Sequence, residues 1–128
     1  MLRRDLSMIA GEGTFTSESI DAGAVVITFD ADVADESDLG VLNHSCDPTL
    51  GFADARHLVT RREVHAGEEL TIDYATMLDD AAYLLRCHCE TYRCRQLVEG
   101  TDWQIPQLQT RYAGHWSPRV QARIDAAT

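Results

Sequence analysis

The stretch Asn43-His44-Ser45-Cys46-Asp47-Pro48 decides the fold, because it sets a polar cluster directly after the apolar pair Val41-Leu42. Its asparagine is the only one in the chain, and its cysteine stands far from the other three, Cys87, Cys89 and Cys94. A lone cysteine upstream of a compact trio supplies the four ligands that a closed metal site requires. We therefore predict that this stretch connects a ligand-binding loop to a metal site.

The later cysteines follow a C-x-C-x4-C spacing, which brings three thiols within eight residues. Structural zinc sites are tetrahedral and most often use thiolates. The sequence therefore predicts structural Zn²⁺ bound by Cys46, Cys87, Cys89 and Cys94. His88 could replace Cys46, but its position between two ligands directs its side chain away. Disulfides are less favoured because cytosolic thiols stay reduced, and unbound free thiols are the remaining alternative.

The length and net charge of the chain limit the kinds of partner that it can bind. The chain has 128 residues, which is typical of one domain, and its net charge is −10. Such an acidic protein is a poor direct partner for DNA or RNA, and it favours a basic peptide or a cation. All eleven basic residues are arginine. Two explanations of that bias are open. A GC-rich genome favours arginine codons, and an enzyme that acts on lysine avoids modifying itself if it has none.

No apolar run approaches the roughly 20 residues of a membrane helix. The first residues, Met1-Leu2-Arg3-Arg4-Asp5, lack the apolar core of a signal peptide. We therefore expect no membrane partner and a cytoplasmic location, or a nuclear one in a eukaryote. A homodimer is left open.

Periodicity predicts short strands and few helices. Strands are expected at residues 57–60 and 69–72, hairpins over 5–30, and an exposed acidic loop over 30–40. Met77–Arg86 has the apolar spacing of a helix. The tail from residue 96 shows no core pattern of its own, but Ser117-Pro118 predicts the start of a C-terminal helix. We expect a core over residues 1–80, a helix and metal motif over 81–97, and a tail over 98–128 that packs on the core.

Four separated blocks resemble one family. They are Ser7–Phe15 with its G-x-G, the opening N-H-S-C-x-P, Ala66–Tyr74 (AGEELTIDY), and the cysteine trio followed by Arg95. Their order over residues 5–97 is similar to that of the SET-domain protein methyltransferases with a post-SET zinc motif. The resemblance implies a mainly β fold (the β-clip or SET fold) with short helices. It also implies a pseudoknot in which N-H-S-C passes beneath the segment around Asp73-Tyr74.

The resemblance implies transfer of a methyl group from S-adenosyl-L-methionine to a lysine ε-amine of a protein. Tyr74 matches the catalytic tyrosine, whose hydroxyl orients the methyl group and the amine. The Asn43 side chain and the His44 main chain match groups that bind the methionine and adenine ends of the cofactor. The other implied cofactor-binding residues are Gly11, Glu12, Gly13, Tyr74 itself, and Leu97 packing on the adenine.

The remaining carboxylates of the third block, Glu68, Glu69 and Asp73, are interpreted as structural hydrogen-bonding groups or as attractors of a basic substrate. His57, His65 and His115 match no partner and are expected at the surface.

The sequence differs from the family pattern in a segment that concerns substrate recognition. Only residues 30–42 separate Phe29 from Asn43, whereas the family carries a longer insert that builds a wall of the peptide groove. We hypothesise that the aromatic tail (Trp103, Tyr112, Trp116) rebuilds this wall, within one chain or in a dimer. Two other functions stay open: methylation of a small amine or another nucleophile, and a non-catalytic zinc-stabilised interaction module.

Overall fold

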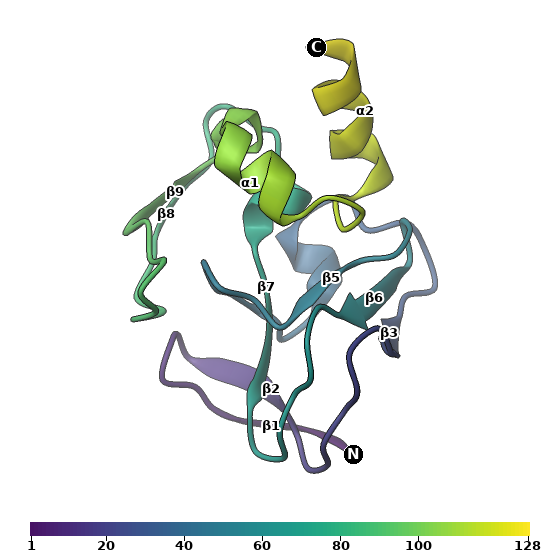
Figure 1. Cartoon of the computed structure of the whole chain (residues 1–128). Helices are drawn as coiled ribbons and strands as arrows, with labels where there is room; N and C mark the ends of the chain where they lie inside the picture. Colours follow the sequence, from purple (N-terminus) through teal and green to yellow (C-terminus); the bar gives the residue numbers. More distant parts are fainter.

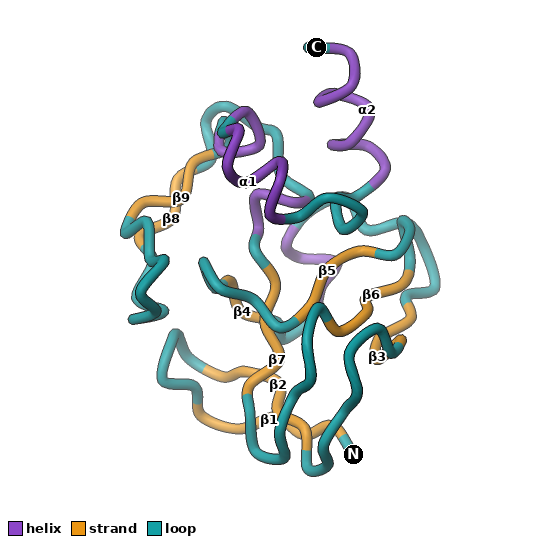
Figure 2. Tube along the Cα trace, viewed as in Figure 1, coloured by secondary structure: helices purple, strands orange, loops and turns teal.

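Short strands make up most of the regular structure in a computed structural model that describes all 128 residues (Figure 2). The strands are β1 (Leu2–Leu6), β2 (Glu12–Thr16), β3 (Val25–Thr28), β4 (Asn43–His44), β5 (Leu50–Phe52), β6 (His57–Thr60), β7 (Glu69–Ile72), β8 (Leu84–Arg86) and β9 (Leu97–Glu99). The helical elements are the 3₁₀ turns η1 (Glu36–Leu39), η2 (Tyr74–Thr76) and η3 (Asp102–Gln104), with the helices α1 (Pro106–Arg111) and α2 (Pro118–Ala126). The predicted mainly β class is confirmed, as are the bounds of β6 and β7.

Strand β7 occupies the centre of the main sheet, whose order is β1-β2-β7-β5-β6-β3 (Figure 1). Strand β4 also pairs with β7, in parallel, with Asn43 opposite Thr71 and His44 opposite Ile72. The N-H-S-C stretch is then enclosed by later parts of the chain. The Arg95 amide donates to Cys46 Sγ at 3.3 Å, and the Tyr112 hydroxyl donates to the Cys46 carbonyl at 3.4 Å. The enclosure agrees with the expected threaded arrangement.

The first hydrophobic core lies along the main sheet. Its fully buried side chains come from adjacent strands and include Phe52, Leu58, Leu70 and Ile72. The predicted hairpin near the N-terminus forms from β1 and β2, but β1 is exposed along its whole length. Strand β3 joins β6 rather than a second local hairpin.

The expectation of a tail without its own core is wrong. A second hydrophobic cluster forms there from Trp103, Leu108, Tyr112, Trp116, Val120 and Ile124, and it packs on Ala75. Helix α2 starts as predicted, because the Ser117 hydroxyl accepts from the Val120 amide and Pro118 occupies the first turn. Gly114, at φ +82°, reverses the chain between α1 and α2, so no single helical period spans the cluster. Both helices lie at the end of the molecule away from β1 (Figure 1).

The predicted helix over Met77–Arg86 is also wrong. The Asp80 side chain accepts from the Ala82 amide in a turn, and the chain then continues as β8. Tyr83 and Leu85 pack on the first core, whereas Leu84 is 62% exposed. That alternation is the period of a strand, and β9 supplies the antiparallel partner.

The acidic loop over residues 30–40 is mostly exposed, as expected, but two side chains anchor it. Val33 and Leu39 are buried in the first core. Asp35 caps η1 through a reciprocal capping box with Asp38. None of the helices has the length and apolarity needed to cross a membrane.

Candidate functional site

The structure brings the four predicted cysteines into one cluster. Their Sγ atoms all lie within 4.8 Å of one another, and those of Cys46 and Cys87 are 3.9 Å apart. A tetrahedral zinc ion with Zn–S bonds of about 2.3 Å requires sulfurs about 3.8 Å apart, so the donor set fits that ion. The chain can turn tightly around the cluster because Glu90 and Gln96 adopt positive φ, at 58° and 65°. His88 is exposed and lies outside the cluster.

Burial keeps two of these thiols protonated unless a cation replaces the proton. It raises the pKa of Cys46 to about 11 and raises that of Cys87 as well. Burial acts in the same direction on Cys89, but hydrogen bonds, beginning with that from Thr91, lower its pKa to about 6. Binding of a metal ion by all four would release protons.

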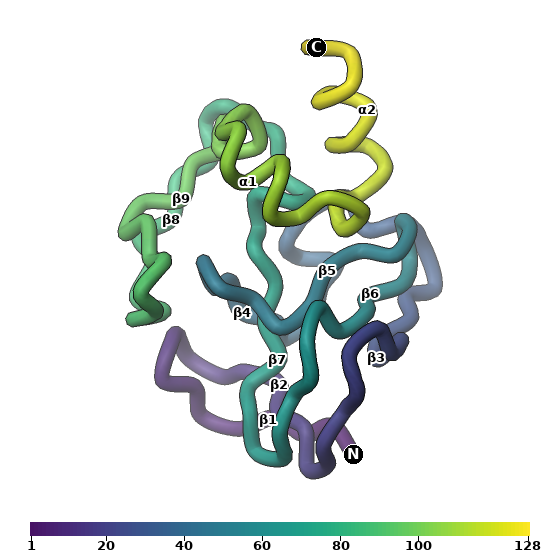
Figure 3. Tube along the Cα trace, viewed as in Figure 1, coloured from purple at the N-terminus to yellow at the C-terminus, as the bar shows by residue number.

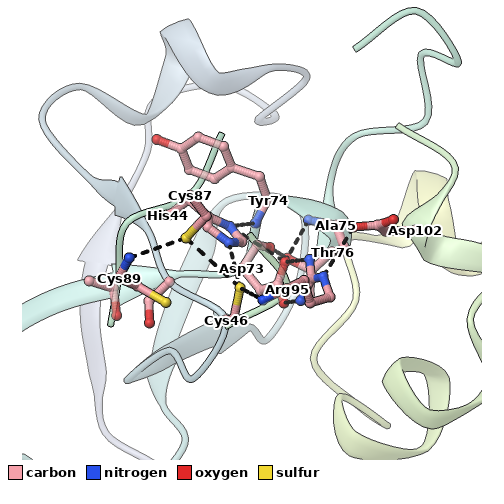
Figure 4. A network of polar contacts seen from close by, with 12 residues as sticks. His44, Cys46, Asp73, Tyr74, Ala75, Thr76, Cys87, Cys89, Arg95 and Asp102 are labelled. Carbon is pink, nitrogen blue, oxygen red and sulfur yellow. Dashed lines mark hydrogen bonds and ion pairs between the residues drawn. The ribbon is translucent and has the colours of Figure 1, made fainter. Parts of the chain in front are cut away.

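The His44 side chain joins the cysteine cluster to the chain near Tyr74 (Figure 4). It is buried, and its Nδ1 accepts from the Tyr74 amide at 2.9 Å. Burial lowers the pKa of His44 to about 4, although Asp73 opposes the shift. The ring is therefore neutral, and its proton resides on Nε2, which lies 3.4 Å from Cys46 Sγ. This donor to a cluster sulfur was missed in the sequence, which suggested only a main-chain role for His44.

Tyr74 is buried, and its hydroxyl donates to the Leu42 carbonyl at 2.7 Å. Burial, with a smaller contribution from the charge of Glu36, raises the pKa of Tyr74 to about 12, so the phenol is neutral. The ring stands edge-on to the His44 imidazole at 5.3 Å between centroids. With its proton engaged by Leu42, the oxygen can offer lone pairs to a positively charged group.

A buried ion-pair network lies directly beside Tyr74 (Figure 4). The Arg95 guanidinium donates to both Asp73 carboxylate oxygens, at 2.7 and 3.0 Å, and to Asp102 at 3.1 Å. The Tyr112 hydroxyl donates to Asp73 at 2.7 Å. Burial of Asp73 favours its neutral form, but these donors and nearby positive charge hold its pKa below the usual value. An arginine immediately after the last cysteine was the one available signal for this network.

Asn43 secures the loop between β1 and β2. Its Nδ2 donates to the carbonyls of Ala10 and Glu12 at 3.0 Å and to the Glu69 carboxylate at 2.8 Å. Because all three partners are acceptors, the amide orientation is fixed, and Oδ1 is left to accept from a ligand. A Cβ at Gly13 would meet the Glu69 carboxylate, so a larger residue here would displace the side chain that accepts from Asn43.

Several predicted site residues meet at one cavity of about 140 Å³. It is lined by Ile9, Ala10, Glu36, Asn43, His44, Tyr74, Leu85, Arg86, Cys87 and His88. Small-molecule sites usually measure about 300–1,000 Å³. The lining of this cavity comes from the loop between β1 and β2 (Ile9, Ala10) and from the segment that follows β8 (Cys87, His88), and these two parts of the chain lie near each other in the Cα trace (Figure 3). Met8, in the same loop between β1 and β2, is 92% exposed.

The other predicted cofactor residues lie at the edge of this region. Gly11 is exposed at φ +44° and directly precedes Glu12, the first residue of β2. Leu97 is 44% exposed and pairs with Arg86 but does not line the cavity. Its contact with adenine stays a prediction.

The carboxylates of the third block have structural partners. Glu68 accepts from the His65 amide and from Arg62, and Glu69 accepts from Ser7 and Asn43. Asp73 is buried and accepts from Arg95. All three carboxylates are therefore structural hydrogen-bonding groups, as interpreted from the sequence.

The expectation about the aromatic tail is wrong, and the expectation of surface histidines holds only in part. Trp103, Tyr112 and Trp116 are buried in the second hydrophobic cluster, so they do not form the wall of an open groove. His115 is half-buried against Gly51, where a Cβ would collide with the His115 side chain, and its Nδ1 has no hydrogen-bond partner. His65 is exposed as expected, and His57 is half-buried beside Asp54 at 2.8 Å.

Residues 28–75, which contain β4, the central β7 and Tyr74, match the family model of the SET domain. The matched residues are similar to a SET domain. One relative is histone-lysine N-methyltransferase 2B of Homo sapiens, 29% identical over 133 residues. That match covers 72% of this chain but only 5% of the human protein, so the chain spans a small part of this relative's length.

Solved structures support the same fold. A structure of KRYPTONITE in complex with mCHG DNA and SAH (S-adenosylhomocysteine) has a TM-score of 0.59 and 23% identity, covering 75% of this chain and 28% of that one. A second structure, of KRYPTONITE with mCHH DNA, an H3(1-15) peptide and SAH, has a TM-score of 0.55 at 23% identity, covering 75% and 29%. The mainly β SET fold predicted from the sequence is therefore confirmed.

Proposed function

We propose that this SET domain transfers a methyl group from S-adenosyl-L-methionine to a lysine ε-amine of a protein substrate. The observation that carries the proposal is the meeting of Asn43, Tyr74 and the loop of Ile9 and Ala10 at one cavity. The relative named a histone-lysine N-methyltransferase and the SAH-bound structures support the choice of reaction.

The residues fit the chemistry of a sulfonium methyl donor. S-adenosyl-L-methionine, when bound, supplies an electrophilic methyl group, so positioning provides much of the catalysis. The Asn43 Oδ1 would accept from the amino end of the cofactor, and loop carbonyls hold that amide in place. The Tyr74 oxygen, a neutral phenol oxygen at neutral pH, would face the partial positive charge on the methyl group and the amine.

The amine of the substrate must be unprotonated to attack. A buried environment lowers the pKa of a lysine ammonium, because burial disfavours the charged form. The buried surroundings of Tyr74 and His44 provide such an environment. A side chain acting as dedicated base is not required by this scheme.

We also propose that the four-cysteine cluster binds a structural Zn²⁺ ion of the post-SET kind. The sulfur separations fit tetrahedral coordination, and the His44 Nε2–H supports one sulfur. Zinc would hold the segment that contains β8 and β9 (the β8–β9 limb) against the stretch that carries Asn43 and Cys46. Four reduced thiols suit a cytoplasmic or nuclear location, where thiols stay reduced.

The substrate we propose is a basic, lysine-bearing protein segment. The net charge of −10 favours such a partner and disfavours direct contact with nucleic acid. The structure with an H3(1-15) peptide concerns KRYPTONITE, and it supports a peptide as the class of substrate here.

Calorimetry with S-adenosylhomocysteine tests the cofactor assignment directly. We expect wild-type protein to bind and Asn43→Ala to bind at least tenfold more weakly, since a charge-assisted hydrogen bond is lost. Glu63 is exposed and does not line the cavity, so Glu63→Gln is the control and should bind like wild type. Failure of wild type to bind at millimolar concentration would favour a non-catalytic, zinc-stabilised interaction module.

A further inference from the structure

One residue, Glu36 of η1, belongs to two cavities. The inner cavity contains Asn43 and Tyr74. The outer one is an open trough of about 460 Å³, whose charged and aromatic lining is Asp35, Glu36, Asp79, Asp80, Tyr83 and Arg119. Glu36 therefore stands where a side chain entering from the trough would pass toward Tyr74.

Among the four carboxylates in the trough, those of Glu36 and Asp80 accept only one hydrogen bond each, and of these two only Glu36 also lines the inner cavity. Asp79 is paired with Arg119 at 2.5 Å and with Arg123 at 3.1 Å. Asp35 accepts from the Ser37 amide, and Asp80 accepts from the Ala82 amide. Glu36 receives a single hydrogen bond, from the Tyr83 hydroxyl at 3.1 Å. Most of its acceptor capacity is thus free for a ligand.

Burial and the negative charge of Glu36 both raise the pKa of two nearby tyrosines, Tyr74 and Tyr83. Burial raises the pKa of Tyr74, and the charge of Glu36 raises it further. The pKa of Tyr83 is raised by the same two causes, with the hydrogen bond to Glu36 adding to them. Each tyrosine therefore stays neutral.

We propose that Glu36 receives the ammonium group of the substrate lysine at the trough, before that side chain advances to Tyr74. This inference rests on the proposed function, and it deepens it by assigning the recognition of the charged substrate. A carboxylate favours the protonated amine, so Glu36 marks the point of entry rather than the point of reaction. The proton leaves to water in the open trough when the amine moves on to the buried surroundings of Tyr74.

The position of Glu36 also gives a role to the short segment before Asn43. Val33 and Leu39 anchor that segment in the first core, and the Asp35 capping box fixes η1 between them. Glu36 is therefore held on a structured turn. The segment over residues 30–42 would then recognise the charge of the substrate instead of forming a long groove wall.

The test uses a small probe, Nα-acetyl-lysine amide, and its norleucine counterpart, which lacks the ammonium. NMR titration of the full chain measures both dissociation constants for wild type, Glu36→Gln and the control Glu18→Gln. Glu36→Gln has nearly the same shape as glutamate, and its amide oxygen can still accept from Tyr83. Glu18 is exposed and lines neither cavity, so its variant makes the same charge change elsewhere.

We expect Glu36→Gln to weaken binding of the lysine probe about tenfold, Glu18→Gln less than twofold, and the norleucine probe to show no dependence on Glu36. Equal losses for the two variants, or equal binding of the two probes, would overturn the proposal. So would the absence of lysine-probe binding to wild type. Calorimetry with S-adenosylhomocysteine on the same samples separates this result from a failure of the proposed function.

Discussion

The Arg95 guanidinium forms two hydrogen bonds with the Asp73 carboxylate, at 2.7 and 3.0 Å, across 22 residues of sequence. Arg95 follows the last cysteine, and its amide donates to Cys46 Sγ. Asp73 caps η2 by accepting from the Ala75 amide, which fixes the turn that begins at Tyr74. One ion pair therefore connects the cysteine cluster to the candidate catalytic tyrosine.

Arg95→Ala should lower the free energy of unfolding by about 3 kcal/mol or more, because it leaves the fully buried Asp73 carboxylate without its main partner. Urea denaturation measures the loss. Arg95→Lys should recover little of it, since an ammonium cannot form the same forked contact. The exposed Arg56, paired with Asp32, provides the control, and Arg56→Ala should change stability little. Equal effects of the Arg95 and Arg56 substitutions would show that the network does not stabilise the fold.

Tyr112→Phe should lower the free energy of unfolding by about 1–2 kcal/mol. The hydroxyl donates to Asp73 and to the Cys46 carbonyl in the interior, and the substitution removes it while the ring keeps its packing. Thermal or urea unfolding tests the loss, with the exposed Tyr92 substituted in the same way as the control. An unchanged unfolding curve for Tyr112→Phe would argue against a structural role for this contact between tail and core.

Asp79 should make the docking of α2 sensitive to acid. Burial alone would raise the pKa of Asp79, but hydrogen bonds from Arg119 and Arg123 lower it below its usual 3.8. A lowered pKa means that the stabilisation is complete above the unfolded pKa and is lost as the pH falls through the lower, folded one. The difference in unfolding free energy between wild type and Asp79→Asn should therefore be constant near neutral pH and shrink in strong acid. A difference that grows toward acid would contradict this assignment.

Removal of zinc should loosen the β8–β9 limb. We expect one zinc ion per chain by elemental analysis, and a lower unfolding temperature after chelation, because bound metal stabilises the folded state. Cys46→Ser should lose the ion. The exposed His88 is the matched control, and His88→Ala should retain it. If Cys46→Ser retained the zinc ion and His88→Ala lost it, His88 would be the fourth ligand.

Local patterns in the sequence were sufficient for some of these features. The β-branched and apolar residues of β6 and β7 predicted both strands, and the cysteine spacing predicted the cluster. Leu78 and Leu85 were misread as one face of a helix, because their spacing also suits a turn followed by a strand. Only the pairing of β8 with β9 distinguishes these two possibilities.

Contacts between distant residues could not be predicted in the same way. Asp73 meets Arg95 and Tyr112, which lie 22 and 39 residues later, and no periodic pattern marks such partners. The second hydrophobic cluster was missed for the same reason, since η3, α1 and α2 each contribute only a few buried side chains. The two-cavity position of Glu36 likewise depends on how η1 folds back beside Tyr83 and Tyr74.

The most direct test is methyl transfer itself. Wild-type protein is incubated with methyl-labelled S-adenosyl-L-methionine and basic lysine-bearing peptides, and the label is located by mass spectrometry. The chain contains no lysine, so self-methylation at lysine cannot obscure the result. We predict label on lysine ε-amines with wild type, and at least a hundredfold loss of rate in Tyr74→Phe with S-adenosylhomocysteine binding retained. Label that appears equally fast with Tyr74→Phe, or no transfer by a wild-type protein that binds the cofactor, would contradict the account.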